Sequence, residues 1–172
     1  MAPHSFPSHE FADLLAANSQ FAQQFSQSSL TGTARQGLAI ITCMDSRISP
    51  LALVGMQPGD AKILRNAGAR VTDDVLRTLV LATYLLGVKR VLVMPHTDCR
   101  MANESETEIH STIEREYGVD TRSVEFRTVE NQHEALAYDV TRIRSYPLLK
   151  SGVVVGGAIY DVATGRLEPI DC

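Results

Sequence analysis

Three side chains of the kind that bind metal ions follow two short apolar runs. Cys43 comes directly after the apolar residues 38–42, and His96 and Cys99 follow the apolar residues 91–94. Two thiolates and one imidazole suit zinc, which prefers four ligands and would keep a fourth position for water or an acidic side chain. Zinc in such a setting lowers the pKa of bound water to about 7, which gives hydroxide at neutral pH. These residues therefore predict a zinc site with an open position.

The two apolar runs are typical of buried strands. Residues 38–42 include β-branched side chains, and Gly37 precedes them. In open α/β sheets, ligands bind outside the carboxyl ends of the strands. If the two strands are parallel neighbours, Cys43, His96 and Cys99 converge at one edge of the sheet. The predicted zinc site therefore requires these two runs to lie side by side.

Asp45 and Arg47 follow Cys43 closely enough to act at the same metal. Asp45 could be the fourth ligand and close the site. Alternatively, Arg47 could hold Asp45 away from the metal as a bidentate ion pair. Asp45 would then accept a hydrogen bond from hydroxide on the metal and orient its lone pair toward the substrate. The two residues could also form a salt bridge that only stabilises the turn.

Asp98 stands between two of the candidate ligands, His96 and Cys99. We expect it to cap the helix that follows, because aspartate is a favoured N-cap residue. It could instead shuttle protons or accept hydrogen bonds from groups around the metal.

The remaining elements alternate between strands and helices. The apolar run of residues 91–94 is part of a strand predicted over residues 89–94. The spacing of apolar residues predicts further strands over residues 60–64, 123–129 and 152–162, and helices over residues 72–87, 104–118 and 131–146. Thr72 and Asn131 are typical N-cap residues, and Gly87 and Gly118 are typical of helix ends. A strand, a helix and a second strand form a unit with a parallel, right-handed crossover. The pattern therefore indicates an α/β fold with a mainly parallel four-stranded sheet, an edge strand, and helices on both faces.

The N-terminal part differs from the rest. Residues 8–27 carry apolar and aromatic side chains at the spacing of one helical face, namely Phe11, Leu14, Leu15, Phe21 and Phe25. This helix could pack on its own domain. Residues 26–36 are rich in Ser, Thr and Gly, which is typical of a loop. We therefore expect one domain over residues 1–172, in which residues 1–35 form an N-terminal helical arm and loop.

Composition excludes several classes of protein. The formal net charge is -4, which argues against a nucleic-acid binder. No apolar stretch approaches the roughly 20 residues of a membrane helix, and the first ten residues lack a secretory pattern, so we expect a cytoplasmic protein without a membrane partner. There are 3 cysteines, and the odd number favours metal chemistry over a disulfide framework. We expect Cys172 to be a free terminal thiol.

Three motifs together resemble the β-class carbonic anhydrases. They are the Cys-x-Asp-x-Arg pattern of residues 43–47, the Arg-Asn-Ala-Gly segment of residues 65–68 and the His-x-x-Cys pattern of residues 96–99. The resemblance runs from about residue 37 to about residue 99, and it resumes at residues 156–165. It implies a zinc enzyme that hydrates carbon dioxide reversibly to bicarbonate and a proton, by means of zinc-bound hydroxide.

The resemblance also implies roles for particular residues. Cys43, His96 and Cys99 would hold the zinc, and Asp45 and Arg47 would form a gating and orienting dyad. Some β-class enzymes have a closed site, in which the residue corresponding to Asp45 binds the zinc, and this site opens as the pH rises. Substrate would be bound beside the metal by Asn66, Ala67 and Gly68. A homodimer or larger homo-oligomer would form, with the N-terminal helix lying across the partner subunit.

One departure from the family keeps a second reading open. Arg100 occupies a position that is commonly glycine, and a bulky cation there could change the mouth of the site or the local backbone. The alternative is a zinc-dependent hydrolase of carbonyl sulfide or carbon disulfide on the same scaffold. A third hypothesis is a non-catalytic zinc or redox-sensing protein. The Asp45–Arg47 pair argues against it, because a structural zinc site has no use for a displaceable ligand.

Overall fold

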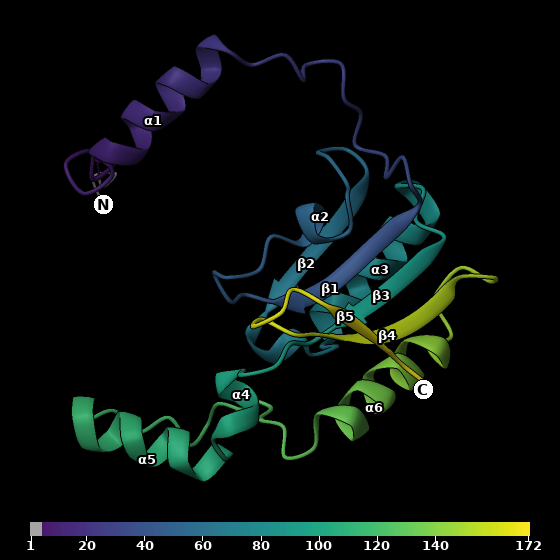
Figure 1. Cartoon of the computed structure of the whole chain (residues 1–172). Helices are drawn as coiled ribbons and strands as arrows, with labels where there is room; N and C mark the ends of the chain where they lie inside the picture. The colour runs from purple at the N-terminus through teal and green to yellow at the C-terminus, as the bar shows by residue number, and fades with distance from the viewer. Residues whose placement is uncertain (1–4) are drawn as a thin grey trace. The chain divides into compact units, whose positions relative to one another are not determined.

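The computed structural model describes residues 5–172 and divides the chain into two units, residues 1–31 and 32–172. The first four residues of the predicted arm lie outside the described part. In the first unit, the predicted helix is present as α1 (Ala12–Gln23), which is drawn in purple in Figure 1. None of the side chains of α1 is buried. The apolar residues predicted to share one face are all exposed, so the first unit does not bury this face within itself.

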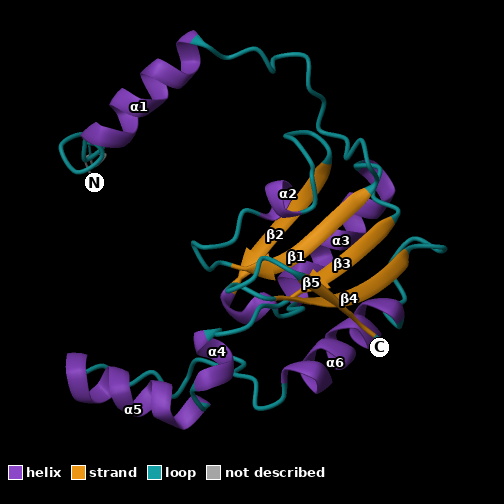
Figure 2. Ribbon diagram, viewed as in Figure 1, coloured by secondary structure: helices purple, strands orange, loops and turns teal. Residues whose placement is uncertain are grey.

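The second unit is built on a five-stranded sheet with the order β2-β1-β3-β4-β5 (Figure 2). Its strands are β1 (Leu38–Cys43), β2 (Ala61–Asn66), β3 (Arg90–Met94), β4 (Val154–Tyr160) and β5 (Leu167–Ile170). The first four strands are parallel, and β5 pairs antiparallel with β4. β1 and β3 are direct neighbours, with Thr42 opposite Met94. The predicted side-by-side pairing of the two apolar runs is therefore confirmed.

Alternating residues of the central strands divide the core between the two faces of the sheet. Ala39 and Ile41 of β1 pack in one cluster with the buried residues of α3 (Asp73–Leu85) and α6 (Gln132–Arg144). Leu38 and Ile40 pack in a second cluster, which also contains Cys43 and Cys99. The remaining helices are α2 (Pro50–Leu53), the 3-10 turn η1 (Ala67–Ala69), α4 (Arg100–Asn103) and α5 (Glu106–Tyr117). Two of the three candidate metal ligands, Cys43 and Cys99, thus belong to the second core cluster.

The helix ends follow the predicted chemistry. The Thr72 hydroxyl accepts a hydrogen bond from the backbone N–H of Val75, and the Asn131 side chain accepts from the N–H groups of His133 and Glu134. Gly118 ends α5 in the left-handed conformation, with φ 67°. These local signals place the ends of α3, α5 and α6 to within a few residues.

The strand predicted over residues 123–129 is wrong. This segment has no ladder partner, and the carboxylate of Glu106 in α5 accepts hydrogen bonds from the backbone N–H groups of Phe126 and Thr128. The N–H of Val129 donates to the carbonyl of Met101 at 2.7 Å. A side chain and a loop carbonyl therefore satisfy the backbone that a neighbouring strand would otherwise pair with. The antiparallel edge of the sheet is instead formed by β5.

Glu106 should make part of the stability depend on pH. Burial raises the pKa of its carboxyl group, but the hydrogen bonds from Phe126 and Thr128 outweigh burial and hold the pKa below 4.5. Because the folded state lowers this pKa, the stabilisation is present above pH 4.5 and is lost as the pH falls further. We expect Glu106→Gln to lower the free energy of unfolding by about 1 kcal/mol at pH 7. The difference from wild type should shrink toward pH 3.5 in urea titrations.

The matched control for this substitution is Glu114→Gln on the same helix, since Glu114 is exposed. It should leave the urea midpoint close to wild type at both pH values. An equal loss in the two variants would show that the Glu106 hydrogen bonds contribute nothing specific.

Candidate metal centre

Cys43, His96 and Cys99 meet at the carboxyl end of the sheet. Cys43 is the last residue of β1, and the other two lie in the loop after β3. All three are buried, and their candidate ligand atoms lie within 4.8 Å of one another. Parallel pairing of β1 and β3 brings the two strand ends to the same edge, as the sequence predicts.

The imidazole of His96 is oriented for a cation. Its Nδ1 lies 2.8 Å from the carbonyl oxygen of Thr97, and a carbonyl can only accept, so Nδ1 carries the proton. Its Nε2 is buried and has no hydrogen-bond partner within the described residues. The His96 backbone is fixed as well, because the side-chain amide of Gln132 donates to its carbonyl at 2.6 Å. A buried nitrogen lone pair beside two sulfurs fits a borderline-soft cation such as zinc.

The two thiols differ in acidity. A hydrogen bond from Cys99 lowers the pKa of Cys43 to about 3, against the opposing effect of burial. Backbone N–H groups of Gly68 and Asp45 also stabilise the Cys43 thiolate. The same sulfur–sulfur hydrogen bond, together with burial, raises the pKa of Cys99. The pair therefore shares one proton, which a divalent cation would displace on binding both sulfurs.

Asp45 and Arg47 form a bidentate ion pair at the rim of this cluster. Arg47 Nε donates to Asp45 Oδ1 at 3.0 Å, and Arg47 Nη2 donates to Asp45 Oδ2 at 2.7 Å. These hydrogen bonds hold the pKa of the Asp45 carboxyl well below its usual range, so it is ionised at neutral pH. Asp45 Oδ2 also lies 3.8 Å from Nε2 of His96. The carboxylate is thus held by Arg47 within a short movement of the candidate metal position.

Asp98 does not cap the following helix, which corrects the expectation from the sequence. The N-cap residue of α4 is Cys99, and no side chain caps this helix end. The Asp98 carboxylate instead accepts a hydrogen bond from Arg47 Nη1 at 2.8 Å. Arg47 therefore contacts both loops that carry the candidate ligands.

Residues 65–68 support the loop after β1 from the neighbouring strand. The guanidinium of Arg65 donates to the carbonyl oxygens of Cys43 at 2.8 Å and Asp45 at 2.6 Å. Asn66 lies opposite Cys43 in the β1–β2 register, and both polar atoms of its amide bond the backbone of Arg70. Gly68 has φ +76°, and a Cβ atom there would lie 3.1 Å from the Cβ of Met101. Glycine therefore permits both the left-handed turn and the close approach of α4.

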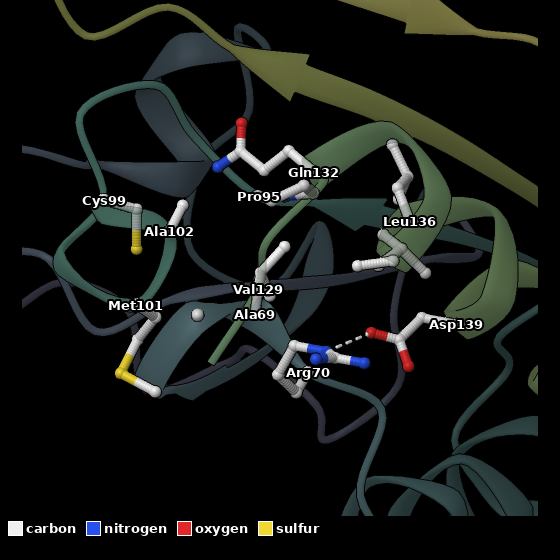
Figure 3. A pocket seen from close by; sticks show the side chains of 13 residues that line it. Ala69, Arg70, Pro95, Cys99, Met101, Ala102, Val129, Gln132, Leu136 and Asp139 are labelled. Carbon is white, nitrogen blue, oxygen red and sulfur yellow. Dashed lines mark hydrogen bonds and ion pairs between the residues drawn. The ribbon is translucent and has the colours of Figure 1, made fainter. Parts of the chain in front are cut away.

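A small, partly open cavity lies beside Cys99. In Figure 3, Cys99 and Met101 lie on one side of it and the ion pair between Arg70 and Asp139 on the other. Its volume of ≈ 10 Å³ corresponds to about one water molecule. The rim beside the cluster is open to solvent, since 46% of the Arg47 side chain and 20% of the Asp45 side chain are exposed.

The pattern of the carbonic anhydrase family matches residues 38–167 of this chain. The β-carbonic anhydrase 1 of Mycobacterium tuberculosis (strain H37Rv) is 33% identical over 159 residues, which cover 92% of this chain and 96% of that protein. The chain belongs to the β-carbonic anhydrase family.

Two further relatives of this family member bear on its fold and chemistry. The crystal structure of carbonic anhydrase from Streptococcus mutans is 33% identical and has a TM-score of 0.87, covering 98% of this chain and 100% of that one. The carbon disulfide hydrolase of Acidianus sp. (strain A1-3) is 32% identical and covers 76% of each chain. The β-carbonic anhydrases are zinc enzymes, and the group of Cys43, His96 and Cys99 can bind a metal ion.

Arg100, the departure from the family pattern, begins α4. Its side chain is exposed and forms an ion pair with Glu104 at 3.0 Å, one helical turn further on.

None of the helices in the described part of the chain combines the length and the apolar character that a membrane-spanning helix needs.

Proposed function

We propose that this protein catalyses the zinc-dependent, reversible hydration of carbon dioxide to bicarbonate and a proton. The observation that carries the proposal is the buried, unpartnered Nε2 of His96 beside two cysteine sulfurs, with the Asp45–Arg47 ion pair at their rim. Family membership supports the same reaction.

In this proposal Cys43, His96 and Cys99 hold the zinc. When bound, zinc supplies a Lewis acid that generates hydroxide from water near neutral pH. The protein residues keep the donor set ready for the ion. The carbonyl of Thr97 fixes the tautomer of His96, and N–H groups around Cys43 stabilise its thiolate.

Asp45 orients the nucleophile. An ionised carboxylate can only accept hydrogen bonds, so Asp45 would accept a hydrogen bond from the attacking hydroxide and orient the lone pair of the hydroxide oxygen toward carbon dioxide. Attack on the carbon moves one C–O electron pair onto oxygen and yields bicarbonate. Arg47 keeps Asp45 in the position from which it accepts this hydrogen bond. If the Arg47–Asp45 ion pair broke, Asp45 could bind the metal as a fourth ligand and close the site.

Substrate would reach the metal from the exposed rim. Arg47 is about half exposed and Met44 is exposed, so both lie where a small molecule can approach from solvent. We place Asn66, Ala67 and Gly68 at the substrate wall. Asn66 would stabilise the turn of residues 66–70 there, because its side-chain amide forms hydrogen bonds with the Arg70 backbone.

We also infer that the protein forms a homodimer or a higher homo-oligomer in the cytoplasm. The apolar residues of α1 are exposed, and a second copy of the chain is a surface on which they could be buried. A reducing compartment suits the metal centre, because Cys43 and Cys99 must stay reduced to bind the ion.

The test is stopped-flow hydration of carbon dioxide by the zinc-loaded protein from about pH 6.5 to 9, a range in which zinc would generate hydroxide from water. Activity should rise with pH. Asp45→Ala should lower it by at least about a hundredfold, while the zinc content is retained. A wild-type protein that binds zinc and shows no activity across this range would refute the proposal.

Asp120→Ala is a matched control for this substitution. Asp120 forms the same bidentate pair with an arginine two residues on, Arg122, at 2.9 and 2.7 Å, but it lies on the surface after α5. It should hydrate carbon dioxide like wild type. A similar loss in both variants would assign the Asp45 effect to general damage of the fold.

Hydrolysis of carbonyl sulfide or carbon disulfide is the second candidate. Its support is the similarity to the Acidianus carbon disulfide hydrolase and the arginine at position 100. The same zinc-loaded preparation should be assayed with both compounds. Turnover of either one, without hydration of carbon dioxide, would establish this function in place of the first.

A further inference from the structure

Asp98 has an unusual backbone for a residue with a side chain. Its φ is 54°, in the left-handed region, and it lies between His96 and Cys99. Residues other than glycine adopt this conformation at a cost, although aspartate and asparagine tolerate it better than most. The segment of residues 96–99 is therefore strained at Asp98.

The Asp98 carboxylate accepts a hydrogen bond from Arg47 and fixes its guanidinium group. Arg47 Nη1 donates to Asp98 Oδ2 at 2.8 Å, and Arg47 Nη2 donates to the Asp98 carbonyl at 3.1 Å. The Nε edge of the same guanidinium holds the carboxylate of Asp45. One planar group therefore spans two aspartates on two different loops, with one edge for each.

We propose that Asp98 is a positioning residue, whose carboxylate fixes Arg47 so that Arg47 keeps Asp45 off the metal. The inference rests on the proposed metal centre. An arginine side chain exposed to this degree has several rotamers available unless both edges are engaged. Asp45 Oδ2 is only 3.8 Å from His96 Nε2, so a loosened Arg47 would release it toward the metal position.

An anion titration of the cobalt-loaded protein measures the open position directly. Cobalt(II) replaces zinc and gives visible absorption bands that change when azide binds the metal. If Asp45 occupies the fourth position in most molecules, the apparent Kd for azide rises in proportion to the open fraction that is lost. The readout is ligand binding and does not depend on turnover.

Asp98→Asn and Asp98→Gly are suitable variants, because asparagine and glycine tolerate the left-handed backbone. Asparagine removes the negative charge of the Asp98 side chain, and glycine removes the whole side chain. We expect the apparent Kd for azide to rise about fivefold or more in Asp98→Gly and less in Asp98→Asn. Loss of a negative charge alone would have the opposite effect, since it would tighten anion binding.

Two controls test whether the Asp98 substitutions change azide affinity through Arg47 and Asp45. Glu104→Gln removes another acid near α4, one that pairs with Arg100 and not with Arg47, and should leave azide affinity within about twofold of wild type. In an Asp45→Ala background, Asp98→Gly should no longer weaken azide binding, because the residue that closes the site is gone.

Unchanged or tighter azide binding in the Asp98 variants would overturn this inference alone, provided that the wild-type protein takes up cobalt and azide. Weaker binding that persists in the Asp45→Ala background would overturn it too, since Asp98 would then act by another route. A wild-type protein that takes up no cobalt would overturn both this inference and the proposed metal centre.

Discussion

Serine in place of Cys43 or of Cys99 should abolish stable zinc binding and the hydration of carbon dioxide with it. Each thiolate supplies one of three buried donors, and a hydroxyl is a much poorer ligand for zinc. Residues that only orient a ligand typically account for about 10–100-fold in metal affinity, so the loss of a ligand should exceed about 100-fold. Zinc content after dialysis, measured by atomic emission, and stopped-flow activity would test this.

The third cysteine provides the control. Cys172 is free and exposed, and its thiol donates to the carbonyl of Ile170 at 3.4 Å, away from the candidate ligands in the sequence. Cys172→Ser should retain both zinc and activity. Full zinc retention in Cys43→Ser or Cys99→Ser would mean that the metal is held elsewhere.

The largest effect on stability should come from Asp139→Ala. Asp139 is buried, with 4% of its side chain exposed, and it accepts a hydrogen bond from Arg70 Nε at 2.7 Å (Figure 3). Removing one partner of a buried ion pair leaves the other charge unpaired, which costs about 3–5 kcal/mol. We expect a loss of that size in the free energy of unfolding, measured by urea titration of the metal-free protein at pH 7.

Two further variants test whether the loss of stability comes from breaking a buried ion pair. Asp74 pairs with Arg77 on the surface, with 73% and 75% of the side chains exposed, so Asp74→Ala should cost less than about 1 kcal/mol. The double variant Arg70→Met with Asp139→Leu should recover most of the loss, because an apolar pair of similar volume needs no partner. Equal losses in Asp139→Ala and Asp74→Ala would contradict the interpretation of a buried pair.

Local chemistry made much of the fold predictable. Thr72 and Asn131 are capping residues whose side chains bond the first turns of α3 and α6, and those bonds need no distant partner. The alternating pattern of residues 123–129 gave a wrong strand prediction, because a strand also needs a neighbouring strand to pair with. The N–H groups of this segment instead donate to the carboxylate of Glu106 and to the carbonyl of Met101. β5 has only 4 residues and contains Pro169, so it carries little strand signal.

The convergence of the candidate ligands was predictable for a different reason. Cys43, His96 and Cys99 follow strands, and parallel neighbours end at one edge, so topology alone brings them together. The contact between Asp98 and Arg47 could not be predicted in the same way. It depends on the left-handed backbone at Asp98, and the sequence suggested a helix cap in its place.

The separation of the donor loops along the chain also links metal supply to the lifetime of the protein. Cys43 and His96 become neighbours only after β1 and β3 have paired, so the unfolded chain lacks the assembled site. An ion that binds only the native state stabilises it by mass action, by about 4 kcal/mol when free metal exceeds the Kd a thousandfold. The apolar cluster beneath α3 and α6 contains none of the donors, so the sheet can assemble before the ion arrives. Zinc-starved cells should therefore contain folded chains that open more often and are degraded faster by proteases, so that zinc supply sets how much of the protein accumulates.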